Sequence, residues 1–159
     1  MPDYRVGIGV DAHSFGEGVP LVLGGVRFEH PRGLVGHSDG DVVTHALIDA
    51  VLGAANFGDI GSHFPSDDAR WRGASSLELL RQAFGALRAL GWELVNADCV
   101  LIGEEPRIGP HRAGMGEALA AALEVEPERI AVRATTTDRL GFAGRGEGLA
   151  AQAVALLAR

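Results

Sequence analysis

Two different hydrophobic periods alternate along the chain, and this feature constrains the fold more than any other. Apolar residues occupy every second position over residues 4–10, which predicts a half-buried strand. Over residues 38–55 and 76–90 they recur at helical spacing, and Gly91 is a natural end for the second helix. The chain therefore combines strands and helices within 159 residues, a length that suits a single domain with one core.

The remaining segments continue the same alternation. We expect strands within residues 20–29, 93–102 and 129–135, and helices over 112–124 and 149–158. Residues 57–74 have no period, and a loop of that length in a small domain is usually functional or mobile. This order predicts an α/β fold of two layers, in which a small mixed sheet is covered by helices and residues 1–159 form one domain.

The charged residues and the cysteine exclude several chemistries. The formal charge is −7, so we expect no basic face and no nucleic-acid partner. All 14 basic residues are arginine, which excludes a Schiff-base lysine and a phosphate loop of the GK[ST] type. Cys99 is the only cysteine and is expected to be buried, so any metal must be held by histidines and carboxylates.

The hydrophobic residues give no sign of a membrane or export segment. No run of about 18 apolar residues occurs, so no membrane span is predicted. The chain does not open with a basic segment followed by an apolar one, so no signal peptide is expected. The cytoplasm is the expected location.

Two groups of polar residues could together hold a metal ion. Asp11 and His13 end the first strand, and side chains two residues apart on a strand project to the same side. Gly7 and Gly9 lie on that side and leave room for a close neighbour. The first helix carries one polar stripe, at a spacing of three, four and four residues: Ser38, Asp41, His45 and Asp49.

The helical stripe has two interpretations. It is either a solvated face, or it presents the metal ligand His45, oriented by the carboxylates of Asp41 and Asp49. Combined with the strand, Asp11, His13 and His45 supply one oxygen and two nitrogens. Three protein ligands with an open fourth position are the pattern of a catalytic zinc site, in which zinc acts as a Lewis acid.

Three further segments suit a phosphate or its metal. His37 and Ser38 stand where a loop enters the first helix, and the free N–H groups of a first turn favour an anion. The alternative for His37 is an ordinary loop histidine. Thr135–Thr137 offer donors and Asp138 could hold magnesium, although threonine and aspartate are also common in simple turns. The glycine-rich residues 140–148 indicate tight turns or close backbone approach.

These motifs, in this order and at these separations, resemble the cyclodiphosphate synthase family nearly end to end. They are D-A-H at 11–13, G-H-S-D-G-D at 36–41 with His45, G-D-I-G at 58–61, F-P-S-D-D at 64–68, A-T-T-T at 134–137 and L-G-F-A-G-R-G-E-G at 140–148. The resemblance implies conversion of 4-diphosphocytidyl-2-C-methyl-D-erythritol 2-phosphate to 2-C-methyl-D-erythritol 2,4-cyclodiphosphate and CMP, in non-mevalonate isoprenoid biosynthesis. The substrate would supply its own nucleophile, so catalysis would consist of alignment and charge neutralisation.

The resemblance also implies roles for individual residues. Asp11, His13 and His45 match zinc ligands, with one Zn²⁺ per subunit. His37 and Thr136 match groups that stabilise the transition state, and Asp138 matches an acidic residue that helps to place Mg²⁺ or Mn²⁺ at the substrate diphosphate. The positions that match substrate contacts are Asp11, Ala12, His13, His37, Ser38, Asp59, Ile60, Gly61, Phe64, Pro65, Ser66, Asp67, Asp68, Gly103, Glu104, Glu105, Pro106, Arg107, Ile108, Gly109, Thr135, Thr136, Thr137, Asp138, Phe142 and Arg145.

Assembly is implied by the resemblance as well. Family members are homotrimers with the site between neighbouring subunits, so a homotrimer is expected here. Phe142 and Arg145 would lie near the central axis and contribute phosphate contacts, and an isoprenoid diphosphate is a candidate ligand of the central channel.

The chain departs from the family pattern at four positions. Asp138 stands where glutamate is expected and shortens the reach toward a metal by one methylene. Arg139 replaces a common lysine, Ser66 replaces a common aspartate, and Gly109 replaces an apolar residue. No departure removes a zinc ligand.

Two other functions use the same residues. One is a zinc-dependent phosphoesterase, in which a metal-bound hydroxide would attack a phosphate ester. The other is a non-enzymatic trimeric module in which Asp11, His13 and His45 hold a structural metal. Release of CMP from the cytidyl substrate would distinguish the expected enzyme from both.

Overall fold

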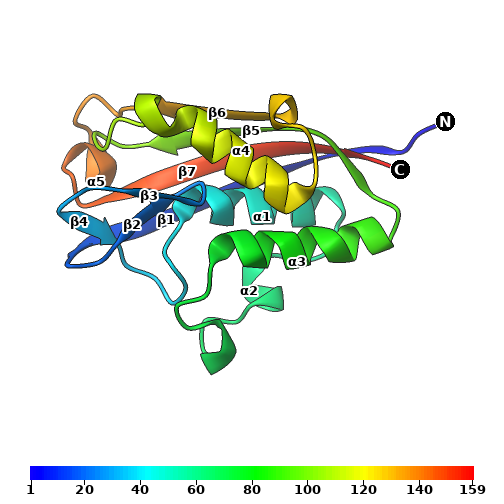
Figure 1. Ribbon diagram of the computed structural model, residues 1–159, viewed down its shortest axis with the longest axis horizontal. Coiled ribbons are helices and arrows are strands. Elements are labelled where there is room, and N and C mark those ends of the chain that lie inside the picture. The colour runs from blue at the N-terminus through cyan, green and yellow to red at the C-terminus, as the bar shows by residue number, and fades with distance from the viewer.

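The computed structural model describes all of residues 1–159 and contains both helices and strands (Figure 1). Its elements, in order, are β1 (Tyr4–Glu17), β2 (Leu21–Leu23), β3 (Val26–Phe28), β4 (Arg32–Leu34), α1 (Val42–Ala54), α2 (Ile60–His63), η1 (Ala69–Trp71), α3 (Ser76–Ala89), β5 (Glu93–Ile102), η2 (Gly109–His111), α4 (Arg112–Leu123), η3 (Pro127–Arg129), β6 (Ile130–Thr135), α5 (Gly141–Gly144) and β7 (Gly148–Ala158).

One mixed sheet of five strands organises the molecule, in the order β4-β1-β7-β5-β6. The first and last strands pair antiparallel from Tyr4 opposite Ala158 to Ser14 opposite Gly148, so the two termini lie together (Figure 1). The last three residues of β1 pair with β4 instead. β5 pairs antiparallel with β7 and parallel with β6, while β2 and β3 form a separate hairpin. The expected mixed sheet is therefore present.

Helix α1 packs directly on the backbone of β1. A Cβ atom added at Gly7 or Gly9 would overlap the carbonyl oxygens of Ala50 and Ala46, so only glycine permits this close approach. Asp11 and His13 continue the same strand face. The close packing therefore places the helix beside the polar end of the face, as the sequence predicted.

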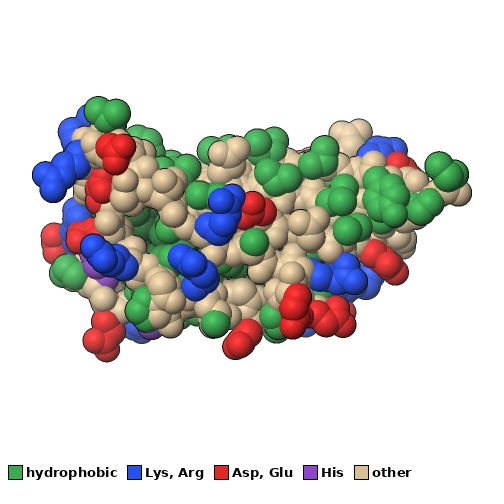
Figure 2. Space-filling view, turned by 90° about the horizontal axis from the view of Figure 1, so that it is seen from above, with side chains coloured by type: hydrophobic (Ala, Val, Ile, Leu, Met, Phe, Trp, Pro, Cys, Tyr) green, Lys and Arg blue, Asp and Glu red, His purple; other side chains and the backbone are tan.

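The opposite face of the sheet is uncovered and apolar. Val6, Ile8 and Val10 of β1 are 69%, 60% and 63% exposed, and Val154 of β7 is 40% exposed. β1 is half-buried as predicted, but its buried half is the glycine face and its apolar row points outward. In the view from above, hydrophobic side chains spread over a broad surface and most of the charges lie toward its rim (Figure 2).

Helices α1 and α4 pack on the other face, α3 packs on these two helices, and together they enclose one core (Figure 1). A single cluster of 35 buried hydrophobic residues includes Leu47 of α1, Phe84 of α3, Leu119 of α4 and Cys99 of β5. Burial of this apolar surface is the main source of stability. Cys99 is buried as expected, and burial raises the pKa of its thiol to about 12. No helix has the length and hydropathy needed to cross a membrane.

The helix predicted over residues 149–158 is wrong, because this segment is the central strand β7. Leu149, Ala151 and Ala153 are buried and alternate with more exposed residues, a period of two that the many alanines obscure. Alanine favours a helix in isolation, yet β7 is paired on both sides and its small residues fit beneath α1.

Several predicted boundaries also shift. β1 continues to Glu17, so Asp11 and His13 lie within the strand rather than at its end. The first helix begins at Val42, with Asp41 as its N-cap, because residues 36–40 form the turn that leads into it. The segment without a period, residues 57–74, contains α2 and η1.

Candidate metal centre

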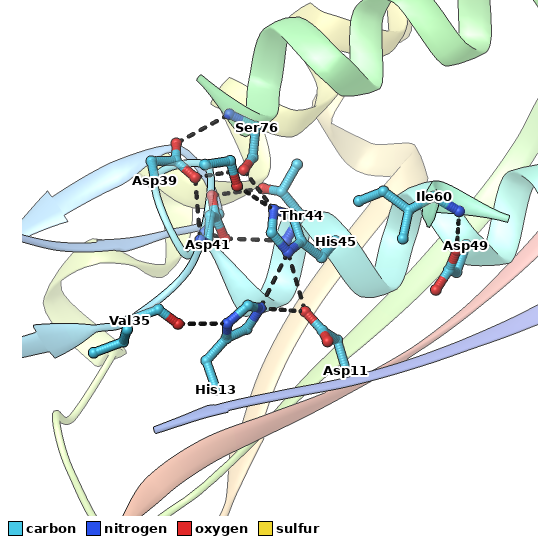
Figure 3. Close-up of polar contacts among 12 residues, drawn as sticks. Asp11, His13, Val35, Asp39, Asp41, Thr44, His45, Asp49, Ile60 and Ser76 are labelled. Atoms are coloured by element: carbon cyan, nitrogen blue, oxygen red, sulfur yellow. Dashed lines mark hydrogen bonds and ion pairs between the residues drawn. The ribbon is translucent and has the colours of Figure 1, made fainter. Parts of the chain in front are cut away.

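Three side chains from two elements converge on one point beside the sheet. His13 Nε2 lies 2.7 Å from Asp11 Oδ2 and 3.2 Å from His45 Nδ1, and His45 Nδ1 lies 3.1 Å from Asp11 Oδ2 (Figure 3). One oxygen and two nitrogens thus form a compact triangle, and this is a group able to hold a metal ion. A tetrahedral ion with bonds of about 2.0–2.2 Å needs ligand atoms roughly 3.3–3.6 Å apart. The two separations from His45 Nδ1, 3.1 and 3.2 Å, are close to this spacing, and Asp11 and His13, 2.7 Å apart, would separate slightly to admit an ion.

The ring of His13 is held for coordination by its second nitrogen. His13 Nδ1 donates a hydrogen bond to the carbonyl oxygen of Val35 at 2.8 Å. In a neutral imidazole this leaves Nε2 without a proton and free to bind a metal. Because β1 pairs with β4 just beyond this position, the carbonyl of Val35 is fixed by the sheet edge.

The carboxyl of Asp11 and the ring of His13 shift each other's pKa. Burial alone would raise the pKa of the Asp11 carboxyl, but its hydrogen bonds to His13 and His45 outweigh burial and hold that pKa well below its usual range. The hydrogen bond to Asp11 raises the pKa of His13, against the opposing effect of burial. A negative carboxylate between two imidazoles is an environment that favours a cation.

His45 is oriented by hydroxyl groups rather than by the predicted carboxylates. Its Nε2 lies 2.8 Å from Ser76 Oγ and 3.0 Å from Ser38 Oγ (Figure 3). Asp49 instead accepts a hydrogen bond from the backbone N–H of Ile60 at 2.7 Å. The Asp41 carboxylate makes no hydrogen bond to the His45 ring, so the predicted role of these two carboxylates in orienting the ring is not supported by their contacts.

The carboxylate of Asp41 has a structural role at the start of α1. It is fully buried and accepts hydrogen bonds from the backbone N–H groups of Gly24, Gly25 and Thr44 and from the Thr44 hydroxyl, at 2.7–3.0 Å. It therefore joins the β2–β3 turn to the helix. The Asp41 cap accepts from the Thr44 N–H, so one of the first-turn amides predicted to bind a phosphate already has a partner in the chain.

The metal-binding triangle opens into a pocket of about 230 Å³. Its walls come from β1, the turn before α1, α1 itself, α2, the following loop and α3. The lining residues are Asp11, His13, His37, Ser38, His45, Ile60, Gly61, Phe64, Ser66, Trp71 and Leu79. Eight of these were named from the sequence as metal or substrate contacts, and a ninth, His45, as a zinc ligand.

The loop over the pocket contacts the turn before α1 and is also held together by its own side chains. His37 Nε2 donates to the carbonyl oxygen of Asp68 at 2.8 Å, and the rings of Phe64 and Trp71 meet edge to face with centroids 5.1 Å apart. Trp71 and Leu79 were not predicted as pocket residues, since nothing in the local pattern of residues 57–74 indicates which side chains turn inward. The indole N–H of Trp71 is buried without a hydrogen-bond partner.

The second half of the predicted site lies elsewhere on the same chain. Thr135–Asp138 follow β6, which is three strand positions from β1, or about 14 Å across the sheet. Arg145 lines a separate hollow of about 590 Å³ with Glu104 and Glu105. Phe142 is closer, since it shares a hollow with Ala12 and His13. Within one chain, the threonines and residues 103–109 are therefore not brought to the metal-binding triangle.

The fold and the site together define a class of protein. It is a mixed α/β domain in which two histidines and one aspartate are arranged to hold a divalent metal ion, open to a pocket of the size that a small molecule occupies. A model of the YgbB family matches residues 4–158, and the chain belongs to this family.

Relatives with known names agree over the whole length. The chain is 56% identical over 156 residues to 2-C-methyl-D-erythritol 2,4-cyclodiphosphate synthase of Alkalilimnicola ehrlichii, covering 98% of this chain and 95% of the relative. A solved structure of 2C-methyl-D-erythritol-2,4-cyclodiphosphate synthase in a CDP-bound form has a TM-score of 0.87 at 40% identity, covering 96% of this chain and 99% of that one. The family resemblance seen in the sequence is confirmed.

One structural relative is a larger protein. The bifunctional IspDF of Campylobacter jejuni superimposes with a TM-score of 0.96 at 42% identity over 99% of this chain. This chain spans only 43% of that protein's length.

Proposed function

We propose that this chain, acting as one domain over residues 1–159, is a cyclodiphosphate synthase. It converts 4-diphosphocytidyl-2-C-methyl-D-erythritol 2-phosphate to the 2,4-cyclodiphosphate and CMP, a cyclising lyase reaction of non-mevalonate isoprenoid biosynthesis. The observation that carries the proposal is the triangle of Asp11, His13 and His45 at the mouth of a pocket, in a chain that is 51–59% identical to enzymes of that name.

The chemistry needs alignment more than a protein nucleophile. The 2-phosphate of the substrate attacks the β-phosphorus, the bond to the CMP oxygen breaks, and the cyclic diphosphate forms. Phosphoryl transfer of this kind depends on positioning and on neutralising charge on the phosphate oxygens. The pocket supplies His37 and Ser38 beside the metal ligands, and both can donate hydrogen bonds to a phosphate oxygen.

We assign a zinc ion to the triangle, because two imidazoles and one carboxylate are typical zinc ligands. Bound there, the ion would supply Lewis-acid stabilisation of phosphate charge. Asp11, His13 and His45 would hold it, and the carbonyl of Val35 keeps the His13 ring in the tautomer that ligation requires. We assign Mg²⁺ or Mn²⁺ to Asp138, in contact with the substrate diphosphate.

The loop residues are assigned to the organic part of the substrate. Ile60, Gly61, Phe64 and Ser66 line the pocket and suit the ribose and erythritol groups. Their neighbours Asp59, Pro65, Asp67 and Asp68 belong to the same assignment. Residues 103–109 are assigned to the cytosine. The Gly103 N–H and the carbonyls of Ile108 and Gly109 are already hydrogen-bonded within the chain, so the residues between them would contact the base.

We further propose a homotrimer. The exposed apolar row of Val6, Ile8 and Val10 needs a covering surface, and such patches mark protein interfaces. A neighbouring copy could bring its Thr135–Asp138 and its residues 103–109 to the metal-binding triangle, which joins the two halves of the site. Phe142 and Arg145 would then face the axis, where an isoprenoid diphosphate is the candidate ligand of the channel.

A phosphoesterase or a non-enzymatic metal module would use the same triangle. The experiment that distinguishes them is incubation of the purified protein with the cytidyl substrate, Zn²⁺ and Mg²⁺, with CMP and cyclic diphosphate measured together. The proposal predicts equal amounts of both products. Inorganic phosphate without cyclisation would support the phosphoesterase, and absence of turnover with an intact metal site would support the module.

His37 allows a more local test. His37→Ala should lower turnover much more than it lowers zinc content, because the ring lines the pocket without belonging to the triangle. A parallel loss of zinc and turnover would show that His37 acts as a ligand.

A further inference from the structure

Coordination by His45 depends on where its ring carries its proton. The atom that faces Asp11 and His13 is Nδ1, so metal binding requires Nδ1 to be unprotonated. A neutral imidazole must then carry its proton on Nε2. The partner of Nε2 therefore decides whether the ring is ready to bind a metal or must first change tautomer.

Ser76 and Asp39 fix the direction of the hydrogen bond at Nε2. The Ser76 hydroxyl forms a short hydrogen bond with Asp39 Oδ1, and the Ser76 N–H donates to Asp39 Oδ2 at 3.0 Å (Figure 3). A carboxylate only accepts, so the single hydroxyl proton of Ser76 is directed to Asp39. Toward His45, 2.8 Å away, Ser76 Oγ offers only a lone pair. His45 must therefore donate to it from Nε2. On the other side of the ring, Nδ1 lies 3.1 Å from the Asp11 carboxylate, which can accept from Nδ1 only while no ion is bound and becomes a neighbouring ligand once the ion is in place.

Ser38 cannot impose this choice. Its hydroxyl also lies near His45 Nε2, at 3.0 Å, but it has no carboxylate partner to direct its proton. It could donate to Nε2 as readily as accept, and it lines the substrate pocket. Ser76, by contrast, is fully buried, so water does not compete for its hydroxyl.

We propose that Asp39 and Ser76 are positioning residues for the metal site, which hold His45 in the tautomer with its proton on Nε2 and thereby present Nδ1 to the ion. The inference deepens the metal-binding part of the proposed function and rests on it. It also assigns a role to the start of α3, where Ser76 is the first helical residue, and to Asp39 in the turn before α1.

The local packing makes the arrangement rigid. Asp39 Oδ1 also accepts a hydrogen bond from the Asp41 N–H, and the Asp39 N–H donates to the carbonyl of Ala74. The same carboxylate is thus tied to the turn before α1 and to α3. Residues that orient a metal-binding histidine through its second nitrogen commonly change metal affinity 10–100-fold when they are replaced.

The test is zinc affinity, measured with Zn²⁺ alone in competition with a chromophoric chelator. Ser76→Ala and Asp39→Asn should each bind Zn²⁺ roughly 10–100-fold more weakly than the unaltered protein. Ser75→Ala is the matched control, because Ser75 is the preceding residue and its side chain makes no capping hydrogen bond. Ser76→Thr keeps the hydroxyl and should restore most of the affinity.

A spectroscopic readout separates positioning from a general loss of structure. In the zinc-bound protein, long-range ¹H–¹⁵N correlation of the His45 ring should show a slowly exchanging proton on Nε2, and in Ser76→Ala that proton should exchange faster with water. A rapidly exchanging Nε2 proton in the unaltered protein, or equal zinc affinity for Ser76→Ala and Ser75→Ala, would overturn the inference. Neither measurement uses substrate. A negative result for Ser76 and Asp39 would therefore not affect the cyclisation assay, and absence of CMP release would not affect the zinc-affinity result.

Discussion

Gly9 of β1 lies directly against the carbonyl oxygen of Ala46 in α1, with no space for a side chain between them. This contact sets the distance between the strand that carries Asp11 and His13 and the helix that carries His45. The metal-binding triangle therefore depends on the absence of a side chain two residues before its first ligand.

Gly9→Ala should damage both the fold and the site. The added methyl would overlap the helix backbone, and overpacking of this kind typically costs about 1–3 kcal/mol or more. Thermal or chemical unfolding measures the loss of stability, and zinc affinity of the folded fraction measures the displacement of α1. Gly85→Ala is the control, since a Cβ at Gly85 meets no atom within 4 Å. Unchanged stability and affinity in Gly9→Ala would contradict the role assigned to this contact.

Asp41 provides a contrast between a structural carboxylate and a metal-site residue. Asp41→Ala would leave the N–H groups of Gly24 and Gly25 and both donors of Thr44 without their partner. Each unsatisfied buried group costs about 1–3 kcal/mol, and four donors lose their partner, so we expect a loss of at least roughly 4 kcal/mol in the free energy of unfolding. Zinc affinity of the folded protein should change little.

The control for Asp41 is Asp49→Asn, on the same helix, which should cost less because its carboxylate accepts one backbone hydrogen bond. Urea unfolding of the two variants side by side measures the difference. A large loss of zinc affinity with unchanged stability in Asp41→Ala would restore the original interpretation of this residue as an orienting partner of His45.

Much of the site could be predicted from the sequence because it depends on local periodicity. Asp11 and His13 share a strand face by their spacing of two, and the glycines before them indicated a close neighbour. The role of Ser76 could not be predicted, because it arises only when the start of α3 meets α1. The alanines of β7 led to a wrong helix prediction, because alanine favours helices when only neighbouring residues are considered. The strand forms through pairing with β1 and β5, which are distant in sequence from most of β7.

The apolar sheet face should mediate assembly. Ile8→Asp places a charge in the centre of the exposed row formed with Val6 and Val10, where a buried and unpaired charge would strongly oppose association. We expect the trimer to dissociate, as measured by light scattering coupled to size-exclusion chromatography. Because Ile8 is 60% exposed in one chain, the monomer should stay folded. A substitution on another exposed surface, Glu117→Ala, should leave the assembly intact, and a trimer that tolerates Ile8→Asp would place the interface elsewhere.

Zinc binding should weaken as the pH falls. The hydrogen bond to Asp11 raises the pKa of His13, so the proton competes with the metal for Nε2 at a higher pH than it would for an ordinary imidazole of pKa about 6.5. Zinc affinity should therefore reach its maximum above the raised pKa of His13 and should fall about tenfold for each pH unit below that pKa. Chelator competition between pH 8 and pH 5.5 measures this slope, and an affinity that is constant across the range would contradict proton competition at His13.

The central claim is that Asp11, His13 and His45 bind one divalent ion at the pocket. Zinc-edge X-ray absorption of the purified protein, with metal content determined in parallel, tests it most directly. We predict one zinc per chain, two imidazole nitrogens and light-atom oxygen ligands at about 2.0–2.2 Å, and loss of the metal in a folded His45→Ala protein. Zinc that is bound through sulfur, or retained with an unchanged spectrum in His45→Ala, would contradict the account.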